Sequence, residues 1–300
     1  MMTKLKVTML GTGSPWPDVE RSGPAQILWI DDQPILIDCG EKVSYQLSKA
    51  NIDLASIDYV FLTHLHADHI LGYGQFLLGR WFSSRKKLTL IGPKGTKQFH
   101  QQILKMYEED IAYKLSLGRP SEGLLDTNII EIESSGEIEI DLPKQVKLRT
   151  AEMIHSILTY AYRFDTGEQS VVFSGDTAPV DELVKLSLNA DTMVVDCCLA
   201  PNKIYSENIS EERKRIWKEL QKEHCDPEQA AKMASQAEAK QLILTHFLPG
   251  TLTDITHLLA TKHFAGEVIV PADLDEILVP GRKSRESLSN GQLGKKYSRA

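Results

Sequence analysis

Residues 63–69 read Thr-His-Leu-His-Ala-Asp-His, directly after the apolar run Tyr-Val-Phe-Leu of residues 59–62. The apolar run predicts a buried strand, and four potential metal ligands follow it within six residues: His64, His66, Asp68 and His69. Burying three imidazoles and a carboxylate together costs several kcal/mol unless an opposite charge compensates. A divalent cation would provide that charge, so the segment predicts a metal-dependent hydrolase.

The spacing of these ligands suits two ions. His64 and His66 are two residues apart, which lets both imidazoles converge on one ion in an extended turn, while Asp68 and His69 can serve a second ion. Other single ligands are expected at the ends of other strands. Three candidates follow or adjoin apolar strands and have small polar neighbours: His155, Asp176 and His246.

Length, charge and cysteine content limit the possible classes of protein. The 300 residues are enough for one large domain or two small ones, and the formal charge of −7 argues against nucleic acid as the main partner. No signal peptide and no run of about 18 apolar residues is evident, so we expect a cytoplasmic protein without a membrane partner. Four cysteines without a CxxC pair predict buried thiols in a reducing compartment: Cys39, Cys197, Cys198 and Cys225.

Strands and helices alternate along the chain, and we expect a single hydrolase domain over residues 1–280. The Ser-, Gly-, Lys- and Arg-rich residues 281–300 lack apolar periodicity and are predicted to be disordered. Apolar spacing predicts a long helix over residues 96–115. Residues 61–64 resemble residues 243–246, which is either chance or the mark of two related half-sheets that face each other.

The complete ligand pattern resembles the metallo-β-lactamase superfamily, over about residues 5–280. The resemblance implies an α/β fold, a four-layer αββα sandwich of two mixed β-sheets, with the metals at the edge between the sheets. It implies a first metal held by three imidazoles: His64, His66 and His155. It implies a second metal held by three further ligands: Asp68, His69 and His246. In this family Asp176 would bridge the two ions.

Two such ions define the chemistry. About 3.5–4 Å apart, they hold a hydroxide at neutral pH and polarise the electrophilic centre of the substrate. Asp68 is placed both to ligate and to orient that hydroxide. Zinc suits imidazole and carboxylate ligands, although Mn, Fe or Co would also fit.

Three shorter motifs resemble the ribonuclease Z and arylsulfatase-like subgroup. Residues 11–17, Gly-Thr-Gly-Ser-Pro-Trp-Pro, and residues 38–41, Asp-Cys-Gly-Glu, are similar to its opening. Residues 224–227, His-Cys-Asp-Pro, resemble the His-Ser-Thr motif of ribonuclease Z, whose His protonates the leaving oxygen and pairs with a Glu. Asp196 stands where that Glu would be, which implies an Asp196–His224 dyad as the general acid. The alternative is that His224 only caps the following helix.

Other stretches depart from ribonuclease Z. Residues 21–24, Arg-Ser-Gly-Pro, replace its Arg-Asn, and residues 247–250, Phe-Leu-Pro-Gly, replace its Ser-x-Arg-Tyr type of sequence. The stretch expected to match its basic, tRNA-gripping arm, about residues 115–127, is short and carries one arginine, Arg119. These departures favour a small anionic ester over tRNA as the substrate.

Four functions remain open from the sequence. The first is hydrolysis of a small phosphodiester or sulfate ester, and the second is a ribonuclease Z-like tRNA 3′-endonuclease, which would require nucleic acid as a partner. The third is a lactonase or other carboxylic ester hydrolase, whose turnover would not depend on His224. The fourth is a non-catalytic protein that keeps its metals.

Some features have both a functional and a structural interpretation. The basic cluster of Arg80, Arg85, Lys86 and Lys87 could steer an anionic substrate or form a solvated loop. Trp16 and Trp81 could line the pocket or pack in the core. The charged, amphipathic helix expected over residues 210–222 is a surface helix that could contribute to a homodimer.

Overall fold

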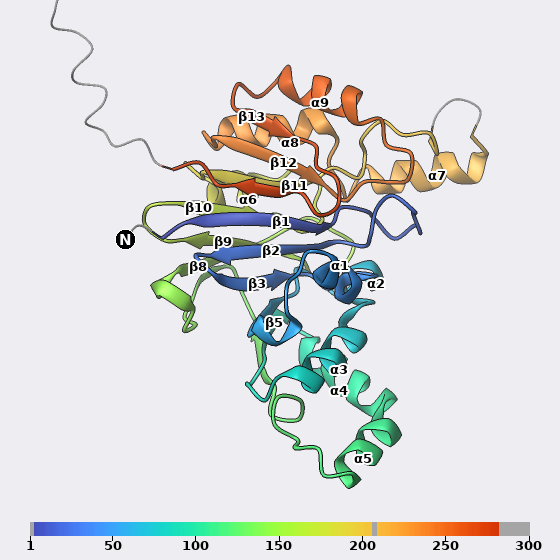
Figure 1. The fold of residues 1–300 in the computed structure, drawn as a ribbon. Helices are drawn as coiled ribbons and strands as arrows, with labels where there is room; N and C mark the ends of the chain where they lie inside the picture. The colour runs from blue at the N-terminus through green and yellow to red at the C-terminus, as the bar shows by residue number, and fades with distance from the viewer. Residues whose placement is uncertain (1–2, 206–208, 282–300) are drawn as a thin grey trace, which may run out of the picture.

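Two seven-stranded β-sheets face each other in the computed structural model, which describes residues 3–205 and 209–281 (Figure 1). The first sheet has the order β14-β1-β2-β3-β4-β5-β6, antiparallel from β14 to β3 and parallel from β3 to β6. Its strands are β1 (Leu5–Gly11), β2 (Ala25–Ile30), β3 (Gln33–Ile37), β4 (Tyr59–Phe61), β5 (Thr89–Pro93), β6 (Asn128–Ile132) and β14 (Glu276–Leu278). The disorder predicted for the tail falls on residues 282–300, which lie outside the described residues.

The second sheet has the order β13-β12-β11-β10-β9-β8-β7. It is parallel from β10 to β13 and antiparallel from β7 to β10. Its strands are β7 (Gly136–Ile138), β8 (Lys147–Glu152), β9 (Tyr160–Asp165), β10 (Ser170–Phe173), β11 (Thr192–Asp196), β12 (Gln241–Thr245) and β13 (Glu267–Ile269).

Helices cover the outer face of each sheet (Figure 1). Those of the first half are α1 (Val43–Lys49), α2 (Ala67–Ile70), α3 (Tyr73–Ser83), α4 (Thr96–Met106) and α5 (Glu108–Ser116), with short 3₁₀ turns at Leu54–Ser56 and Pro143–Gln145. Those of the second half are α6 (Asp181–Leu186), α7 (Glu211–Leu220), α8 (Pro227–Gln236) and α9 (Thr253–Thr261). In the part of the chain that the structure describes, every helix is too short or too polar to span a bilayer.

Three apolar clusters correspond to the three contacts between these layers. The central one joins the two sheets, where the ring of Phe61 meets those of Tyr162 and Phe164 edge to face at 5.3 and 5.1 Å. The outer two lie under α1 and α3 on one side and under α6, α8 and α9 on the other. Both β11 and β12 are buried along their whole length, as expected of parallel strands covered on both faces. The predicted αββα sandwich is therefore confirmed.

Strand register brings the polar residues at the strand ends together. Pairing of Ile37 with Phe61 places Asp38 beside Thr63, and pairing of Asp196 with Thr245 places His246 beside the end of β11. Ligand sites in α/β sheets form in this way at the carboxyl ends of parallel strands. The segments around residues 61–64 and 243–246, which resemble each other, end β4 in the first sheet and β12 in the second.

The chain backbone around the site is unusually constrained. Gly40 touches the neighbouring backbone so closely that a Cβ atom there would lie 2.5 Å from the carbonyl oxygen of Asp68. His246 has a φ of 64°, a left-handed conformation that costs a non-glycine residue about 1–3 kcal/mol. Such strain at a buried imidazole is typical of a functional site.

The long helix predicted over residues 96–115 is wrong in one respect, because it is broken at Tyr107. This residue has a φ of −105° and separates α4 from α5. Its ring packs against Gly74 of α3, where a Cβ atom would lie only 2.9 Å from the ring. The contact comes from a distant segment, so the local apolar spacing does not reveal it.

The basic cluster differs from both of its interpretations, because one of its members is buried. Arg80 is fully buried, and its guanidinium donates to the carbonyl oxygen of Ile57 (2.6 Å) and to Asp58 (2.9 Å). Trp81 is a core residue that donates from Nε1 to Pro120. Arg119 donates to the carbonyl oxygen of Trp81 (3.0 Å), so residues 115–127 fold back onto α3. Neither Arg80 nor Trp81 lines a substrate pocket.

Candidate metal centre and general acid

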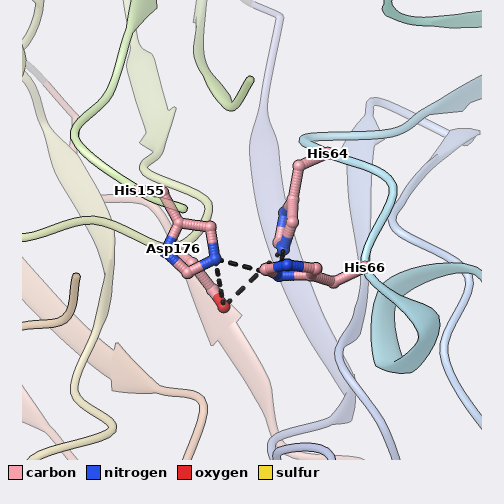
Figure 2. Close-up of side chains that lie close together, drawn as sticks. All are labelled: His64, His66, His155 and Asp176. Carbon is pink, nitrogen blue, oxygen red and sulfur yellow. Dashed lines mark hydrogen bonds and ion pairs between the residues drawn. The ribbon is translucent and has the colours of Figure 1, made fainter. Parts of the chain in front are cut away.

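Four side chains from three segments converge at the first predicted metal site: His64 and His66 from one loop, His155 after β8 and Asp176 after β10 (Figure 2). His66 Nδ1 lies 3.1 Å from His64 Nε2 and 3.0 Å from His155 Nε2. Asp176 Oδ2 lies 3.7 Å from His64 Nε2 and 3.8 Å from His155 Nε2. One potential ligand atom from each of the four residues lies within 4.8 Å of the others.

The second predicted site lies beside the first and shares Asp176. His246 Nε2 lies 3.1 Å from Asp68 Oδ2 and 3.2 Å from Asp176 Oδ2. His69 Nε2 lies 3.6 Å from Asp68 Oδ2 and 3.3 Å from Asp176 Oδ1. The structure therefore brings together all seven predicted ligands, and Asp176 is the one that belongs to both groups.

Hydrogen bonds behind the ligands fix which ring nitrogen faces the centre. Asp38 accepts a hydrogen bond from His69 Nδ1 (2.8 Å) and is itself held by the backbone N–H of Thr63 (2.8 Å). The Nδ1 of His155 donates to the carbonyl oxygen of Glu223 (3.2 Å). Both arrangements leave Nε2 with its lone pair toward the shared space, as metal-binding imidazoles require.

The donor set fits divalent ions. The Nε2 of His69 is buried and has no hydrogen-bond partner among the described residues, although carboxylates surround it. Burial lowers the pKa of His64 well below its usual value, so this imidazole is neutral. Burial favours a neutral Asp176, but His246 and His69 outweigh it and hold the pKa of this carboxyl well below its usual range. Neutral imidazoles and ionised carboxylates are the forms that bind metal.

The buried surroundings of His69 favour a positive charge at this imidazole. Burial lowers the pKa of His69, yet the carboxylates of Asp176, Asp38 and Asp68 together raise it well above the usual value. The same carboxylates would favour a metal ion beside Nε2, and a bound ion and a proton would compete for this nitrogen.

The predicted dyad is also assembled. His224 Nδ1 donates to Asp196 Oδ2 at 2.8 Å, and both side chains are buried. Asp196 is oriented by the backbone N–H groups of Cys198 (2.9 Å) and Thr177 (3.2 Å). Asp226, rather than His224, caps α8, so the capping alternative for His224 is wrong.

The charge state of His224 suits an acid. Burial lowers its pKa, but the hydrogen-bonded Asp196 outweighs burial and raises the pKa to about 9. The imidazole is therefore protonated at neutral pH. It lies 4.0 Å from Asp176 Oδ2, which places the acid at the edge of the metal centre.

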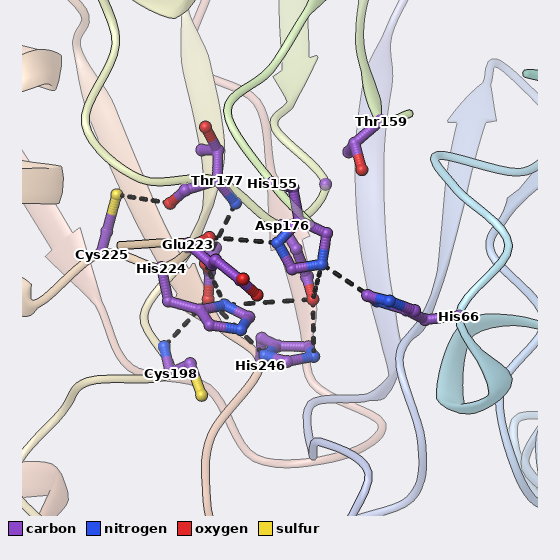
Figure 3. Close-up of polar contacts among 12 residues, drawn as sticks. His66, His155, Thr159, Asp176, Thr177, Cys198, Glu223, His224, Cys225 and His246 are labelled. Atoms are coloured by element: carbon purple, nitrogen blue, oxygen red, sulfur yellow. Dashed lines mark hydrogen bonds and ion pairs between the residues drawn. The ribbon is translucent and has the colours of Figure 1, made fainter. Parts of the chain in front are cut away.

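A cavity of about 350 Å³ opens over the site and is lined by His224 and by five of the predicted ligands: His66, Asp68, His155, Asp176 and His246. Its polar floor comes from the site itself, and its remaining wall is largely apolar: Pro15, Trp16, Tyr205, Ile216, Leu220 and Leu248. Among the described residues that line the cavity, none is a lysine or an arginine. Besides the predicted site residues, this lining includes one charged side chain, Glu223, which Figure 3 shows beside His155 and His224. Trp16 thus faces the pocket, as one of its two interpretations proposed.

Solved structures of other proteins share this fold. The metallo-β-lactamase fold protein YhfI from Bacillus subtilis superposes with a TM-score of 0.72 at 20% identity, covering 92% of this chain and 100% of that one. The short form of human tRNase Z superposes with a TM-score of 0.68 at 23% identity, covering 92% of this chain and 99% of that one. At these identities the likeness establishes the fold.

Sequence comparison establishes the family. The family described as "Anti-Pycsar protein Apyc1" matches residues 5–243. Ribonuclease Z from Mycolicibacterium gilvum (strain PYR-GCK) is 31% identical over 290 residues, covering 92% of this chain and 97% of that one. The chain therefore belongs to the family of that model, and it is a relative of ribonuclease Z. It is thus a metallo-β-lactamase-fold hydrolase of the ribonuclease Z group, as the motifs implied.

Two residues of this hydrolase's site were not predicted. Asp38 was noted only as part of a family-like opening, although it orients His69. Glu223 was not singled out at all, although it lines the cavity beside His224. Asp38 follows β3 and meets His69, whereas Glu223 follows α7 and adjoins His155. Each is far along the chain from the ligand that it adjoins, so the spacing of residues around that ligand does not reveal it.

Replacing Asp38 with asparagine is expected to weaken metal binding by about 10- to 100-fold. The amide can no longer fix the His69 tautomer as a carboxylate does, and the backbone bond to Thr63 can persist. Competition with a fluorescent chelator measures the affinity. Asp53→Asn, at an exposed 3₁₀-turn cap, is the matched control, and an unchanged metal affinity in Asp38→Asn would show that Asp38 has no such role.

Proposed function

We propose that this hydrolase is a phosphodiesterase in which His224 protonates the leaving oxygen. The observation that carries the proposal is the 2.8 Å pairing of His224 with Asp196, because His224 lines the same cavity as five of the seven predicted ligands: His66, Asp68, His155, Asp176 and His246. An ester with a poor leaving group needs such an acid, because an alkoxide leaves slowly unless it receives a proton. A carboxylic ester hydrolase has less need of it.

Two divalent metal ions, with zinc as the proposed metal, would be held by the seven ligands and would supply charge stabilisation and water activation when bound. Asp68 adjoins the cavity and would orient the attacking water. Asp196 holds His224 by Nδ1, so that Nε2 is the atom that carries the transferable proton. The apolar side chains of the cavity wall would lower the polarity around the reacting group.

Two phosphodiester substrates have support. Similarity to ribonuclease Z over more than nine-tenths of the chain favours RNA, with the 3′ end of a tRNA precursor as the first candidate. The absence of lysine and arginine from the described lining of the cavity favours a small phosphodiester. Sulfate and carboxylic ester hydrolysis gain no support from the relatives, and they serve as contrasts in the test.

The test is a substrate panel with the zinc- or manganese-loaded protein. Bis(4-nitrophenyl) phosphate is expected to be cleaved much faster than 4-nitrophenyl sulfate or 4-nitrophenyl acetate. A tRNA precursor tests the RNA candidate, which predicts cleavage and binding that weakens steeply with salt. Turnover of the acetate alone would overturn the phosphodiesterase proposal, and failure to retard tRNA at low salt would leave the small substrate.

A further inference from the structure

The hydroxyl of Thr63 is a buried polar group beside the metal centre that the proposed mechanism does not use. Its Oγ1 donates to Asp38 Oδ2 at 2.9 Å and lies 3.0 Å from His64 Nδ1. A hydroxyl has one hydrogen, so toward His64 it can only accept. His64 Nδ1 therefore carries a proton, and Nε2 keeps the lone pair that faces His66 and Asp176 (Figure 2).

The same oxygen atom of Asp38 also supports the second predicted site. His69 Nδ1 lies 2.8 Å from Asp38 Oδ2, the atom that accepts from the Thr63 hydroxyl. The other oxygen, Oδ1, accepts from the backbone N–H of Thr63 (2.8 Å). One buried carboxylate thus fixes the tautomer of His69 directly and that of His64 through one hydroxyl. These two imidazoles belong to different predicted sites, so the support is common to both.

The backbone around this pair is tightly held. Asp38 has a φ of 58°, a left-handed conformation that costs a non-glycine residue about 1–3 kcal/mol. The carbonyl oxygen of Thr63 accepts from the backbone N–H of Tyr160 (2.9 Å), which ties it to β9 in the other sheet. A Cβ atom on Gly175, the residue before Asp176, would lie 2.8 Å from Thr63 Cβ. Such strain persists only where surrounding contacts enforce it, and here it holds a carboxylate against two ligand systems.

We propose that Thr63 and Asp38 couple the two metal sites, with Thr63 as the positioning residue that links His64 to His69. The inference rests on the two-metal centre of the proposed function and not on its substrate. When His64 Nε2 is occupied, its Nδ1–H becomes a stronger donor to Thr63, and hydrogen bonds in a chain strengthen one another. Asp38 is then ordered for His69 before the second ion binds, so ordering that ligand costs less.

A change at Thr63 should therefore weaken binding at both sites. Thr63→Val keeps the shape of the side chain and the backbone N–H that meets Asp38, but it removes the hydroxyl. Each of the two binding steps is expected to weaken by about 10- to 100-fold, the usual effect of losing support behind a metal ligand. Thr63→Ser, which restores the hydroxyl, should bind both ions nearly as the wild type does.

The test measures metal affinity and ring tautomers in the zinc-loaded protein. Competition with chelators of different strength gives both binding steps for the wild type, Thr63→Val, Thr63→Ser, Asp38→Asn and the double variant. Thr63→Ala, which also lacks the hydroxyl, is measured in parallel so that the comparison does not depend on the folding of one variant. Long-range proton–nitrogen NMR spectra report which ring nitrogen of His64 and His69 carries the proton. Thr150→Val is the matched control, because it removes a similarly buried hydroxyl that donates to a backbone carbonyl oxygen of β9 (2.8 Å).

In the wild type both rings should carry their proton on Nδ1. Thr63→Val should lose the Nδ1 proton signal of His64 to exchange with water and should shift that of His69, which Thr63 reaches through Asp38. The effect of Thr63→Val on the second binding step should be smaller in the Asp38→Asn background, because the chain of hydrogen bonds is already broken there. Thr150→Val should match the wild type in every measurement.

Two results would overturn the inference. One is a Thr63→Val protein that weakens at most one binding step and leaves the His69 signal in place. The other is a Thr63→Ser protein that binds as weakly as Thr63→Val, because the hydroxyl would then not be the responsible group. A wild type that holds two zinc ions but hydrolyses no phosphodiester refutes the proposed function alone. A wild type that holds fewer than two ions refutes the two-metal centre, and the coupling with it.

Discussion

Replacing Asp176 with alanine is expected to lower phosphodiesterase activity by on the order of 10³-fold or more and to leave the protein short of metal. Asp176 lies within 3.2–3.8 Å of ligand nitrogens from four imidazoles, and it is the residue common to both predicted sites. Loss of one ligand should therefore disturb both ions, whereas residues behind the ligands typically cost only about 10- to 100-fold. Elemental analysis of the purified variant measures the metal content.

Asp181→Ala is the matched control, because Asp181 is an exposed aspartate in the first turn of α6. It should bind as much metal as the wild type and hydrolyse bis(4-nitrophenyl) phosphate at the same rate. If Asp176→Ala kept two metal equivalents and most of its activity, the assignment of Asp176 as a shared ligand would be refuted.

The second large effect is expected at His224. His224→Ala should lower kcat by about 10²- to 10⁴-fold on a phosphodiester with an alkoxide leaving group, because the leaving oxygen loses its proton donor. Metal content should not change, since His224 Nδ1 is hydrogen-bonded to Asp196 at 2.8 Å, whereas the predicted ligand Asp176 lies 4.0 Å away. His263→Ala, which removes a partly exposed imidazole near the end of α9, is the control. Equal losses of metal and activity in His224→Ala would indicate a structural role.

The pH profile gives an independent measurement of the same acid. In the folded protein Asp196 outweighs burial and raises the pKa of His224 to about 9, so the active, protonated form is present below that pH and is lost as pH rises through it. Bound cations repel the imidazolium proton, so the alkaline limb of kcat is expected at or below about pH 9. Asp196→Asn should move the limb to lower pH, and the limb should be absent from His224→Ala.

The metal ligands could be predicted because their signal is local. His64, His66, Asp68 and His69 lie within six residues after an apolar strand, and that density is hard to explain without a cation. The remaining ligands each follow a strand, and strand ends of one sandwich meet at one edge. The αββα fold came with the family resemblance, and both are confirmed by the structure and its relatives.

The residues that sequence reasoning missed depend on contacts between distant segments. Asp38 reaches His69 because β3 and β4 pair in register, and Glu223 reaches the cavity because α7 ends over it. In the sequence Arg80 resembles part of a solvated basic cluster. In the structure it is buried, and its guanidinium donates hydrogen bonds to a backbone carbonyl oxygen and to Asp58. Charge patterning along the chain cannot distinguish a surface arginine from a buried one whose partners lie elsewhere.

The expectation of a small substrate rested on departures from ribonuclease Z, and the relatives favour a nuclease instead. Within residues 115–127, Arg119 contacts α3, where it donates to the carbonyl oxygen of Trp81 and lies over the ring of Phe82.

The most direct test of the account is the leaving-group dependence of phosphodiester hydrolysis by the metal-loaded enzyme. Methyl aryl phosphodiesters whose phenols span several pKa units would be hydrolysed by the wild type and by His224→Ala. We expect a shallow dependence of log kcat on phenol pKa in the wild type, because His224 neutralises the leaving oxygen, and a much steeper one in the variant. Equal slopes for the two proteins, or hydrolysis of carboxylic esters with none of phosphodiesters, would contradict it.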